Sequence, residues 1–370
     1  MMRMSEHDAF LKKAGWGDAL VAPLPGDAST RRYARLTRGD STAMLMHQPQ
    51  GAETPAAAAD ASEEVRRALG YNAVARLAGA DCGRFAAVAD YLRGRGLAAP
   101  KIYAADFPRG LAVLEDFGDA LFAEVLSEGE SEEELYKAAV EVLARLHVEG
   151  APVRLADGVP LHAYDEIALI AETDLLPEWF LPLALDRPAT PDELSEHRAL
   201  WRAALRSVKD SPRVFVHRDF HAQNLIWMPD RDGLARVGLI DFQDAVAGPR
   251  AYDLVSLIAD ARRDVSPELA EIATAHYLAA MRAQGMPVNE AEFRAEMAVM
   301  AAQRNIKIVG IFARLYKRDG KRRYLSYLPR LWTYLDRDLS HPALADLRRW
   351  YDRTLPAALR TLPQIERGAV

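Results

Sequence analysis

Residues 214–244 read VFVHRDFHAQNLIWMPDRDGLARVGLIDFQD, and this stretch carries most of what the sequence says about fold and function. It contains three short apolar runs, at 214–216, 225–228 and 237–240, separated by polar connectors. Short runs rich in Val, Ile and Leu, bounded by Asp, Asn and Pro, are typical of β-strands. The stretch therefore predicts three strands whose connecting loops hold the charged and amide side chains.

The second and third runs predict a hairpin that turns at Asp232-Gly233. A type I′ turn needs positive φ at both central residues, and Asp-Gly is a favoured pair for it. With this turn Asn224 lies directly opposite Asp241, and opposed residues are about 5 Å apart at Cα. Pro229 cannot donate to the ladder, so we expect an edge strand or a wider turn. A register slip of one residue would separate the pair.

This pairing has a chemical consequence, because an amide oxygen beside a carboxylate suits Mg²⁺, which takes few protein oxygens together with substrate phosphates. Asp219 lies on the loop that precedes the first strand of the hairpin. A carboxylate near the metal, but not bound to it, can accept a hydroxyl proton. Asp219 as base, with Asn224 and Asp241 on the metal, is the set that phosphoryl transfer from ATP requires. Each residue alone is more typical of a solvated turn, and the metal site is favoured only by the three residues together.

Composition excludes several other classes of protein. The chain has 370 residues, with 47 Lys and Arg against 53 Asp and Glu, and its net charge of −6 disfavours non-specific nucleic-acid binding. The single cysteine, Cys82, leaves no disulfide framework and no Cys-based zinc site. P-loop, HExxH and G-x-S-x-G motifs do not occur. Without a signal-peptide core or a run of roughly 18 apolar residues, we expect a cytoplasmic protein.

Along the chain the predicted elements change from strand-rich to helix-rich. Strands are predicted at 29–36, 42–47, 101–104 and 111–115. Helices are predicted at 85–95 and, further on, at 193–207, 250–262, 267–283 and 290–315. An Ala-rich segment at 51–80 is expected to be a surface insertion with one helix flanked by loose chain. This order predicts an α+β, bilobal fold, with a small β-rich N-lobe at 1–115 and a larger, mainly helical C-lobe at 116–370.

The pattern His217-x-Asp219-x-x-x-x-Asn224, followed by Ile240-Asp241-Phe242, resembles the catalytic and metal-binding motifs of the aminoglycoside phosphotransferase and choline kinase-like families. These are small-molecule kinases with the protein-kinase fold. The resemblance covers most of the chain and includes GDASTRRY at 26–33, LEDFG at 114–118 and GPRAYDL at 248–254.

Longer segments are similar to the bacterial anomeric N-acetylmuramate/N-acetylglucosamine kinases of cell-wall recycling. These segments are ETDLLPEWF at 172–180, FQDAVAGPRAYDLVSL at 242–257 and QRNIKIVGIFARL at 303–315. The resemblance implies that ATP, with Mg²⁺, phosphorylates the C1 hydroxyl of an N-acetyl amino sugar in peptidoglycan recycling. It also implies that the partner of the protein is a small-molecule sugar, and that the protein binds neither nucleic acid nor a membrane. The protein is expected to be a monomer.

The same resemblance implies roles for particular residues. The catalytic base is Asp219, the metal ligands are Asn224 and Asp241, and His217 and Asp253 support the catalytic loop. The residues expected at the nucleotide are Gly26, Ser29, Arg31, Arg32, Glu115 and Phe117. The residues expected at the sugar are Glu172, Asp174, Trp179 and Arg304, with Lys307 as the alternative to Arg304 for a lactyl carboxylate.

The sequence departs from the family pattern at one position. Kinases of this fold usually carry a lysine on the third strand of the small lobe, but the strand at 42–47 has Met44 and Met46 and no lysine. Arg31, Arg32 or Lys101 would then supply the charge. Two alternatives to the amino-sugar kinase stay open: a kinase for aminoglycosides, choline-like compounds or another sugar, and a pseudokinase-like binding module.

Overall fold

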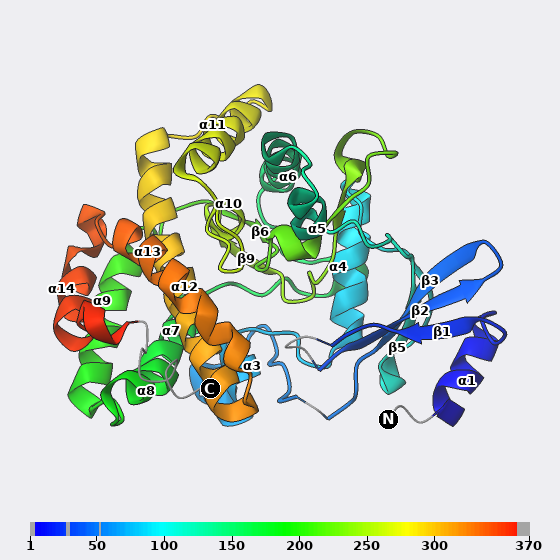
Figure 1. Ribbon diagram of the computed structural model, residues 1–370, viewed down its shortest axis with the longest axis horizontal. Coiled ribbons are helices and arrows are strands. Elements are labelled where there is room, and N and C mark those ends of the chain that lie inside the picture. Colours follow the sequence, from blue (N-terminus) through cyan, green and yellow to red (C-terminus); the bar gives the residue numbers. More distant parts are fainter. Residues whose placement is uncertain (1–3, 27–29, 52, 361–370) are drawn as a thin grey trace. The chain divides into compact units, whose positions relative to one another are not determined.

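The computed structural model describes residues 4–26, 30–51 and 53–360 and divides into two compact units (Figure 1). The first unit comprises Met1–Val142, Pro152–His162 and Ala222–Val246, and the second comprises Leu143–Ala151, Ala163–His221 and Ala247–Val370. The fold is α+β, as predicted, with the sheet in the N-terminal part and mostly helices in the C-terminal part. Both units are discontinuous in sequence. The boundary between lobes after residue 115 stays a prediction.

Five antiparallel strands form the sheet of the first unit, in the order β1-β2-β3-β5-β4. Their bounds are Leu20–Pro23 (β1), Arg32–Arg38 (β2), Ser41–His47 (β3), Ile102–Asp106 (β4) and Leu111–Leu114 (β5). β2 and β3 form a hairpin in which Arg38 pairs with Ser41 across a tight turn. Gly39 has a φ of 56° in this turn, a conformation that glycine adopts without steric cost. The four strands predicted for this region are all present.

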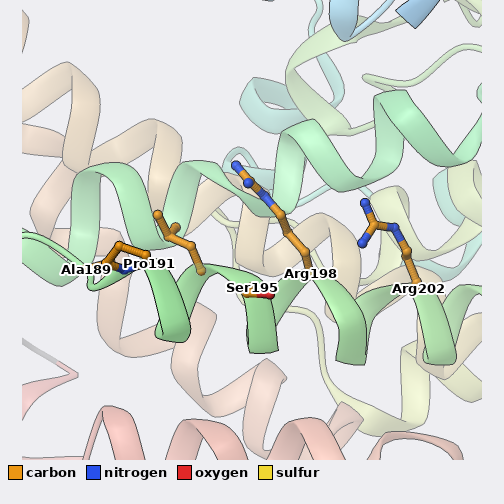
Figure 2. A pocket seen from close by; sticks show the side chains of 6 residues that line it. Ala189, Pro191, Ser195, Arg198 and Arg202 are labelled. Atoms are coloured by element: carbon orange, nitrogen blue, oxygen red, sulfur yellow. The ribbon is translucent and has the colours of Figure 1, made fainter.

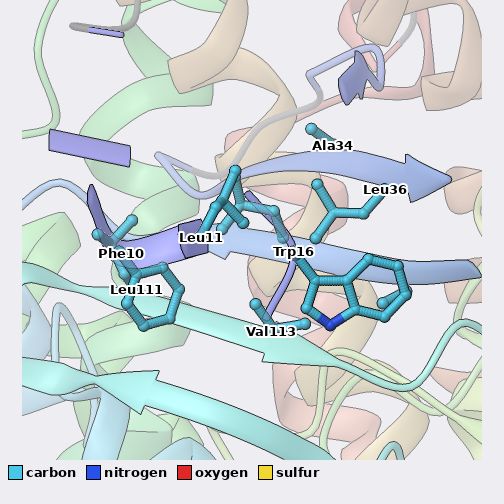
Figure 3. Close-up of a cluster of buried hydrophobic side chains, with 9 residues drawn as sticks. Phe10, Leu11, Trp16, Ala34, Leu36, Leu111 and Val113 are labelled. Carbon is cyan, nitrogen blue, oxygen red and sulfur yellow. The ribbon is translucent and has the colours of Figure 1, made fainter. Parts of the chain in front are cut away.

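One face of this sheet packs against the N-terminal helix α1 (Met4–Lys13), as Figure 3 shows. Because successive side chains of a strand alternate between its faces, every second residue of β2 and β3 joins this core. Its buried members are Phe10, Leu11, Trp16, Ala34, Leu36, Ala43, Leu45, Leu111 and Val113. The intervening residues of β2 and β3 therefore belong to the opposite face of the sheet.

The Ala-rich segment contains two short helices, α2 (Glu63–Leu69) and α3 (Tyr71–Val74), rather than the single helix expected. Two buried arginines hold it by donating to backbone carbonyls. Arg66 donates to Ala73 and Val74, and Arg76 donates to Ala58 and Ala59 at 2.8 and 3.0 Å. Helix α4 (Cys82–Gly94) follows and ends before Gly96, as the sequence indicates.

The β7–β8 hairpin of the first unit corrects the predicted register. Strands β7 (Leu225–Trp227) and β8 (Val237–Leu239) are antiparallel, but Leu225 pairs with Leu239, one residue away from the predicted partner Ile240. Asp232 has an extended backbone (φ −90°, ψ 146°), so the type I′ turn does not form. Instead the strand ends before Pro229, and Gly233–Arg236 forms a 3₁₀ turn in a wider loop. The wider turn that Pro229 suggested is correct.

Helices dominate the second unit, together with the short strands β6 (Arg213–Val216) and β9 (Val246–Pro249). The helices are α7 (Glu166–Thr173), the π-helical turn η3 (Leu176–Phe180), α8 (Leu181–Leu185), α9 (Pro191–Arg206), α10 (Tyr252–Ile258), α11 (Pro267–Ala283), α12 (Glu290–Asp319), α13 (Leu328–Asp338) and α14 (Ala345–Thr354). Earlier in the chain lie α5 (Phe122–Ser127) and α6 (Glu132–His147). The predicted helices are present, although α10 is shorter than expected.

Helix α12 is the central helix of the second unit, in contact with α7, η3, α10 and α13. Asn289 caps its N-terminus by accepting from the backbone N–H groups of Ala291 and Glu292. At Gly310 the helix touches the chain between α7 and η3, where an added Cβ would lie 2.4 Å from the carbonyl carbon of Leu175. Within the described residues, no helix combines the length and apolar character that crossing a bilayer needs.

Candidate active site

The catalytic loop predicted from the sequence begins directly after β6 in the second unit. The Asp253 carboxylate, on α10, accepts hydrogen bonds from the backbone N–H groups of His217 at 2.6 Å and Arg218 at 2.9 Å. Burial raises the pKa of Asp253 to about 7, against the opposing effect of these two bonds. Arg218 has a φ of 83°, which is uncommon for a side-chain-bearing residue. The loop is thus held in a strained conformation one residue before Asp219.

Asp219 is half-buried on this loop. Burial acts to raise the pKa of its carboxyl group, but the positive field of Lys307, His221, Arg218 and Arg304 outweighs it and leaves the pKa below its usual range. The carboxylate is therefore ionised at neutral pH. A general base has to be in this state to accept a proton.

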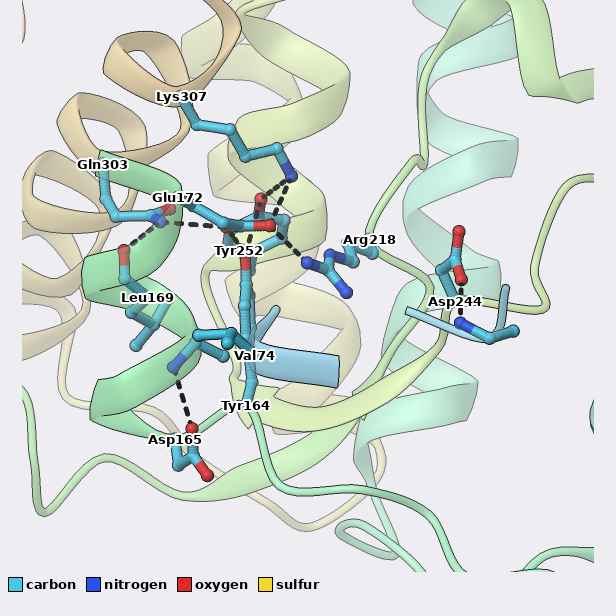
Figure 4. A network of polar contacts seen from close by, with 12 residues as sticks. Val74, Tyr164, Asp165, Leu169, Glu172, Arg218, Asp244, Tyr252, Gln303 and Lys307 are labelled. Carbon is cyan, nitrogen blue, oxygen red and sulfur yellow. Dashed lines mark hydrogen bonds and ion pairs between the residues drawn. The ribbon is translucent and has the colours of Figure 1, made fainter. Parts of the chain in front are cut away.

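A buried polar network lies beside the loop (Figure 4). At its centre Glu172, on α7 and 1% exposed, accepts hydrogen bonds from Tyr164, Arg218 and, at 3.0 Å, Gln303. Lys307 Nζ lies 3.3 Å from the same carboxylate. Burial acts to raise the pKa of Glu172, but Arg218 and Lys307 lower it below its ordinary value. Both carboxylate oxygens are thus engaged by side chains of the same unit.

The other residues expected at the sugar also lie in the second unit. Asp174 is 5% exposed and accepts two hydrogen bonds from Arg198 Nε, at 2.9 and 3.1 Å. Trp179 is half-buried on η3, and Arg304 is 4% exposed and donates to the Ala259 carbonyl at 3.2 Å. Glu172 and Asp174 therefore make internal contacts, which the helical pattern of the sequence did not reveal.

A separate pocket of about 410 Å³ lies along α9 (Figure 2). It is lined by Ala189, Pro191, Leu194, Ser195, Arg198 and Arg202. Both arginines have acidic partners: Arg198 binds Asp174, and Arg202 Nε lies 3.4 Å from Glu166. The pocket shares no lining residue with the catalytic loop.

The two residues expected to bind metal belong to the first unit, at the end of the β7–β8 hairpin. The Asn224 carbonyl accepts from Ile240 N–H at 3.2 Å, so the observed register makes Ile240, and not Asp241, the partner of Asn224. Asp241 follows with a φ of 61°, and its side chain is 43% exposed. The predicted direct opposition of Asn224 and Asp241 is therefore wrong, although both residues stay at the open end of the hairpin. Their amide and carboxylate oxygens are still of the kind that Mg²⁺ prefers.

Asp241 Oδ1 accepts two hydrogen bonds within the first unit, from Arg31 Nη1 at 3.2 Å and from Gln243 Nε2 at 3.0 Å. Arg31 precedes β2, and its side chain is 9% exposed. Burial acts to lower the pKa of Arg31, but Tyr33 and Asp241 raise it above its usual value. The guanidinium is therefore firmly charged. The sequence proposed both residues for the site, but it gave no sign that they touch.

The LEDFG segment is tied to the rest of the first unit at three points. Glu115 accepts from Lys101 N–H at 3.1 Å and from Arg231 at 2.8 Å. The Phe117 ring packs so closely on Gly238 that a Cβ there would lie 2.8 Å away. Arg35, which the sequence analysis did not single out, donates to Asp116 at 2.7 Å and to Asp119 at 2.6 Å.

The remaining nucleotide candidates are placed as follows. Gly26 lies just after β1, and Arg32 is exposed at the start of β2. Ser29 lies outside the described residues. The sequence does contain one signal for Arg35. Residues 31 and 35 are separated by an even number of positions, so strand alternation puts both side chains on the same face of the sheet.

The model of the phosphotransferase enzyme family matches residues 21–288. The chain belongs to this family, whose members transfer phosphoryl groups. It is 46% identical to an N-acetylmuramate/N-acetylglucosamine kinase of Caulobacter vibrioides over 358 residues, which cover 95% of this chain and 96% of the relative. A Pseudomonas aeruginosa protein of the same name is 32% identical, with 90% of this chain and 89% of the relative covered.

Solved structures show the same fold. An ADP-bound aminoglycoside phosphotransferase superposes with a TM-score of 0.54 at 13% identity, over 91% of this chain and 99% of that one. The fold and family expected from the HxDxxxxN and IDF motifs are therefore confirmed.

Proposed function

We propose that this chain is an ATP-dependent kinase that phosphorylates N-acetylmuramate and N-acetylglucosamine. The observation that carries this proposal is the 46% identity, over 95% of the chain, to a kinase named for these two sugars. The ionised Asp219 and the strained loop that presents it agree with a kinase that acts on a hydroxyl group.

Asp219 orients the sugar hydroxyl and accepts its proton as the oxygen bonds to the γ-phosphorus of ATP, and ADP leaves with the electrons of the broken P–O bond. The acceptor we propose is the anomeric C1 hydroxyl, which is more acidic than an ordinary alcohol. Little basicity is then needed, and a carboxylate of low pKa suffices. His217 and Asp253 hold the loop that carries Asp219.

Asn224 and Asp241 would hold Mg²⁺, which neutralises charge on the phosphates when it is bound. The residues we propose around the nucleotide are Gly26, Ser29, Arg31, Arg32, Glu115 and Phe117. Backbone groups of the segment 114–117 would bind the adenine edge. Glu115 and Phe117 support this segment through their contacts with Arg231 and Gly238.

For the sugar, we propose that Trp179 offers a ring face and that Arg304 binds the lactyl carboxylate of N-acetylmuramate. Glu172 and Asp174 were expected there too, but their carboxylates are engaged by Arg218 and Arg198. We therefore propose that Glu172 and Asp174 position other residues of the sugar site and do not contact the sugar themselves. We further propose that the protein acts as a monomer in the cytoplasm, in peptidoglycan recycling.

Incubation with Mg-ATP and a panel of sugars, aminoglycosides and choline tests the proposal. We expect turnover on N-acetylmuramate or N-acetylglucosamine and a ³¹P NMR signal of a sugar 1-phosphate. Turnover on another compound alone would make the chain a different small-molecule kinase. If no compound is turned over, and Asp219→Ala leaves nucleotide binding unchanged, the chain is a binding module.

A further inference from the structure

The sheet face opposite the apolar core carries two cations in place of the usual lysine. Tyr33 pairs with Met46 and Arg35 pairs with Met44 across β2 and β3, so these four residues share one face. Met44 and Met46 are the positions of the third strand that point to this face, where kinases of this fold place their phosphate-binding lysine. Arg31, two residues before Tyr33, extends the same row.

Of the two arginines in this row, Arg35 is committed to the LEDFG segment. Its guanidinium is bound by the carboxylates of Asp116, which is 4% exposed at the side chain, and of Asp119. The two carboxylates outweigh the single positive charge of this guanidinium, so the group as a whole does not attract a phosphate. Arg31 has a different partner, because its Nη1 lies 3.2 Å from Asp241 Oδ1, the carboxylate proposed to bind metal.

A single oxygen of Asp241 therefore serves two competing purposes. Oδ1 accepts the N–H groups of Arg31 and Gln243, so this oxygen is engaged and a positive guanidinium lies where a metal ion would approach the carboxylate. A cation that arrives alone is repelled by the guanidinium at this short distance, or has to displace it from the carboxylate. A metal–nucleotide complex brings its own phosphate oxygens, which accept a guanidinium in bidentate geometry.

We propose that Arg31 exchanges partners during the catalytic cycle. Without nucleotide it neutralises Asp241, and when the metal–nucleotide complex binds, it moves to a phosphate oxygen while the metal takes the carboxylate. This inference rests on the proposed kinase function. Arg31 thereby replaces the missing strand lysine and couples the binding of metal to that of nucleotide. Such coupling is reciprocal between the two ligands.

The test measures two affinities of the full-length Arg31→Met protein, which we expect to change in opposite directions. Mn²⁺ binding without nucleotide is measured by electron paramagnetic resonance, and Mg-ADP binding by calorimetry. We expect Arg31→Met to bind Mn²⁺ about fivefold more tightly, at the lower end of known coupling energies. We expect it to bind Mg-ADP at least ~10-fold more weakly, because a charge-assisted hydrogen bond is lost.

Arg38→Met is the matched control, since Arg38 lies at the far end of the strand that follows Arg31, is exposed and has Asp18 as one partner at 3.9 Å. It should change neither affinity. Arg31→Gln provides a second variant of different shape, should Arg31→Met fail to fold as judged by circular dichroism. Equal or weaker Mn²⁺ binding in the folded variant overturns the exchange.

The failure of this inference differs from the failure of the kinase proposal. A wild-type protein that phosphorylates its sugar, with variants that show no opposite shifts, overturns the exchange alone. A wild-type protein that does not bind Mg-ADP at all overturns both.

Discussion

Glu172 and Arg218 form an ion pair in the interior of the second unit, and each side chain is only 1% exposed. Arg218 is the residue directly before Asp219, and its backbone has a positive φ. Glu172 holds its side chain, while Asp253 holds its backbone N–H. A helix distant in sequence thus fixes the conformation of the loop that carries Asp219, the proposed base.

The first prediction concerns Glu172→Gln. Removing this charge leaves Arg218 and Lys307 buried without their carboxylate, and breaking a buried pair costs about 3–5 kcal/mol. We expect the free energy of unfolding in urea to fall by about that amount. We also expect kcat to fall more than KM rises, because the substitution displaces the proposed base but leaves the contacts of the substrate in place.

Asp338→Asn is the control for this effect. Asp338 is also a buried carboxylate of the second unit, and it accepts a hydrogen bond from Asn305 at 3.0 Å. This variant should lose stability but keep kcat. Wild-type kcat in folded Glu172→Gln would show that the ion pair serves stability only.

The second prediction concerns Asp219, the proposed base. Asp219→Asn keeps the shape of the side chain but cannot accept the hydroxyl proton. We expect kcat to fall by about 10²–10⁴-fold, the usual contribution of a general base, with little change in thermal unfolding. A loss of less than about tenfold, measured with a coupled ADP assay, contradicts the assigned role.

The third prediction concerns pH. The cations around Asp219 hold its pKa below the ordinary value, and Lys307 is the first of them in effect. Removing this positive charge destabilises the carboxylate relative to the protonated acid, so the pKa of Asp219 rises. In Lys307→Met, activity should therefore be lost at a higher pH on acidification than in the wild type, as shown by kcat/KM profiles from pH 4 to 8.

Lys317→Met controls for the loss of a lysine from the same helix, since Lys317 is exposed near the end of α12. Its profile should coincide with that of the wild type. An unshifted acid limb in Lys307→Met would mean that Lys307 does not act on the base.

The fourth prediction concerns Gly238→Ala. The new methyl group would lie 2.8 Å from the Phe117 ring and 2.9 Å from Met228 Cε, so the ring has to move. Overpacking of this kind costs about 1–3 kcal/mol, and it displaces the segment proposed to bind adenine. We expect weaker Mg-ADP binding by calorimetry.

Gly94→Ala is the matched change, because nothing lies within 4 Å of the position its Cβ would take. It should leave Mg-ADP affinity intact. Equal affinities in the two variants would argue against a nucleotide role for the segment at Phe117.

Local features of the fold could be predicted because their causes are local. Two short runs on either side of a turn at 38–40 predicted β2 and β3, and the segments predicted as helices at 193–207 and 290–315 form α9 and α12. The register of β7 and β8 could not be predicted, because it depends on the backbone of Asp232. This residue is extended, although Asp-Gly favours a tight turn.

The contacts of the site were harder to predict than its residues. The motif identified Asp219, Asn224 and Asp241 as candidates, but Arg31 and Asp241 are separated by 210 positions and their pairing has no local signal. Glu172 looked like a helix-surface acid that could reach a sugar. Its burial depends on Arg218 and Lys307, which come from distant parts of the chain.

Gly310 offers a one-letter diagnostic for homologous sequences. A methyl group there would overlap the backbone at Leu175, which lies three residues after Glu172, the acid that holds Arg218, and one residue after Asp174. Any homologue with a larger residue at this position must set its α7 segment further from α12. Lys307 lies one helical turn before Gly310 on α12. In such a homologue, the distance of 3.3 Å between its Nζ and the Glu172 carboxylate on α7 cannot be assumed.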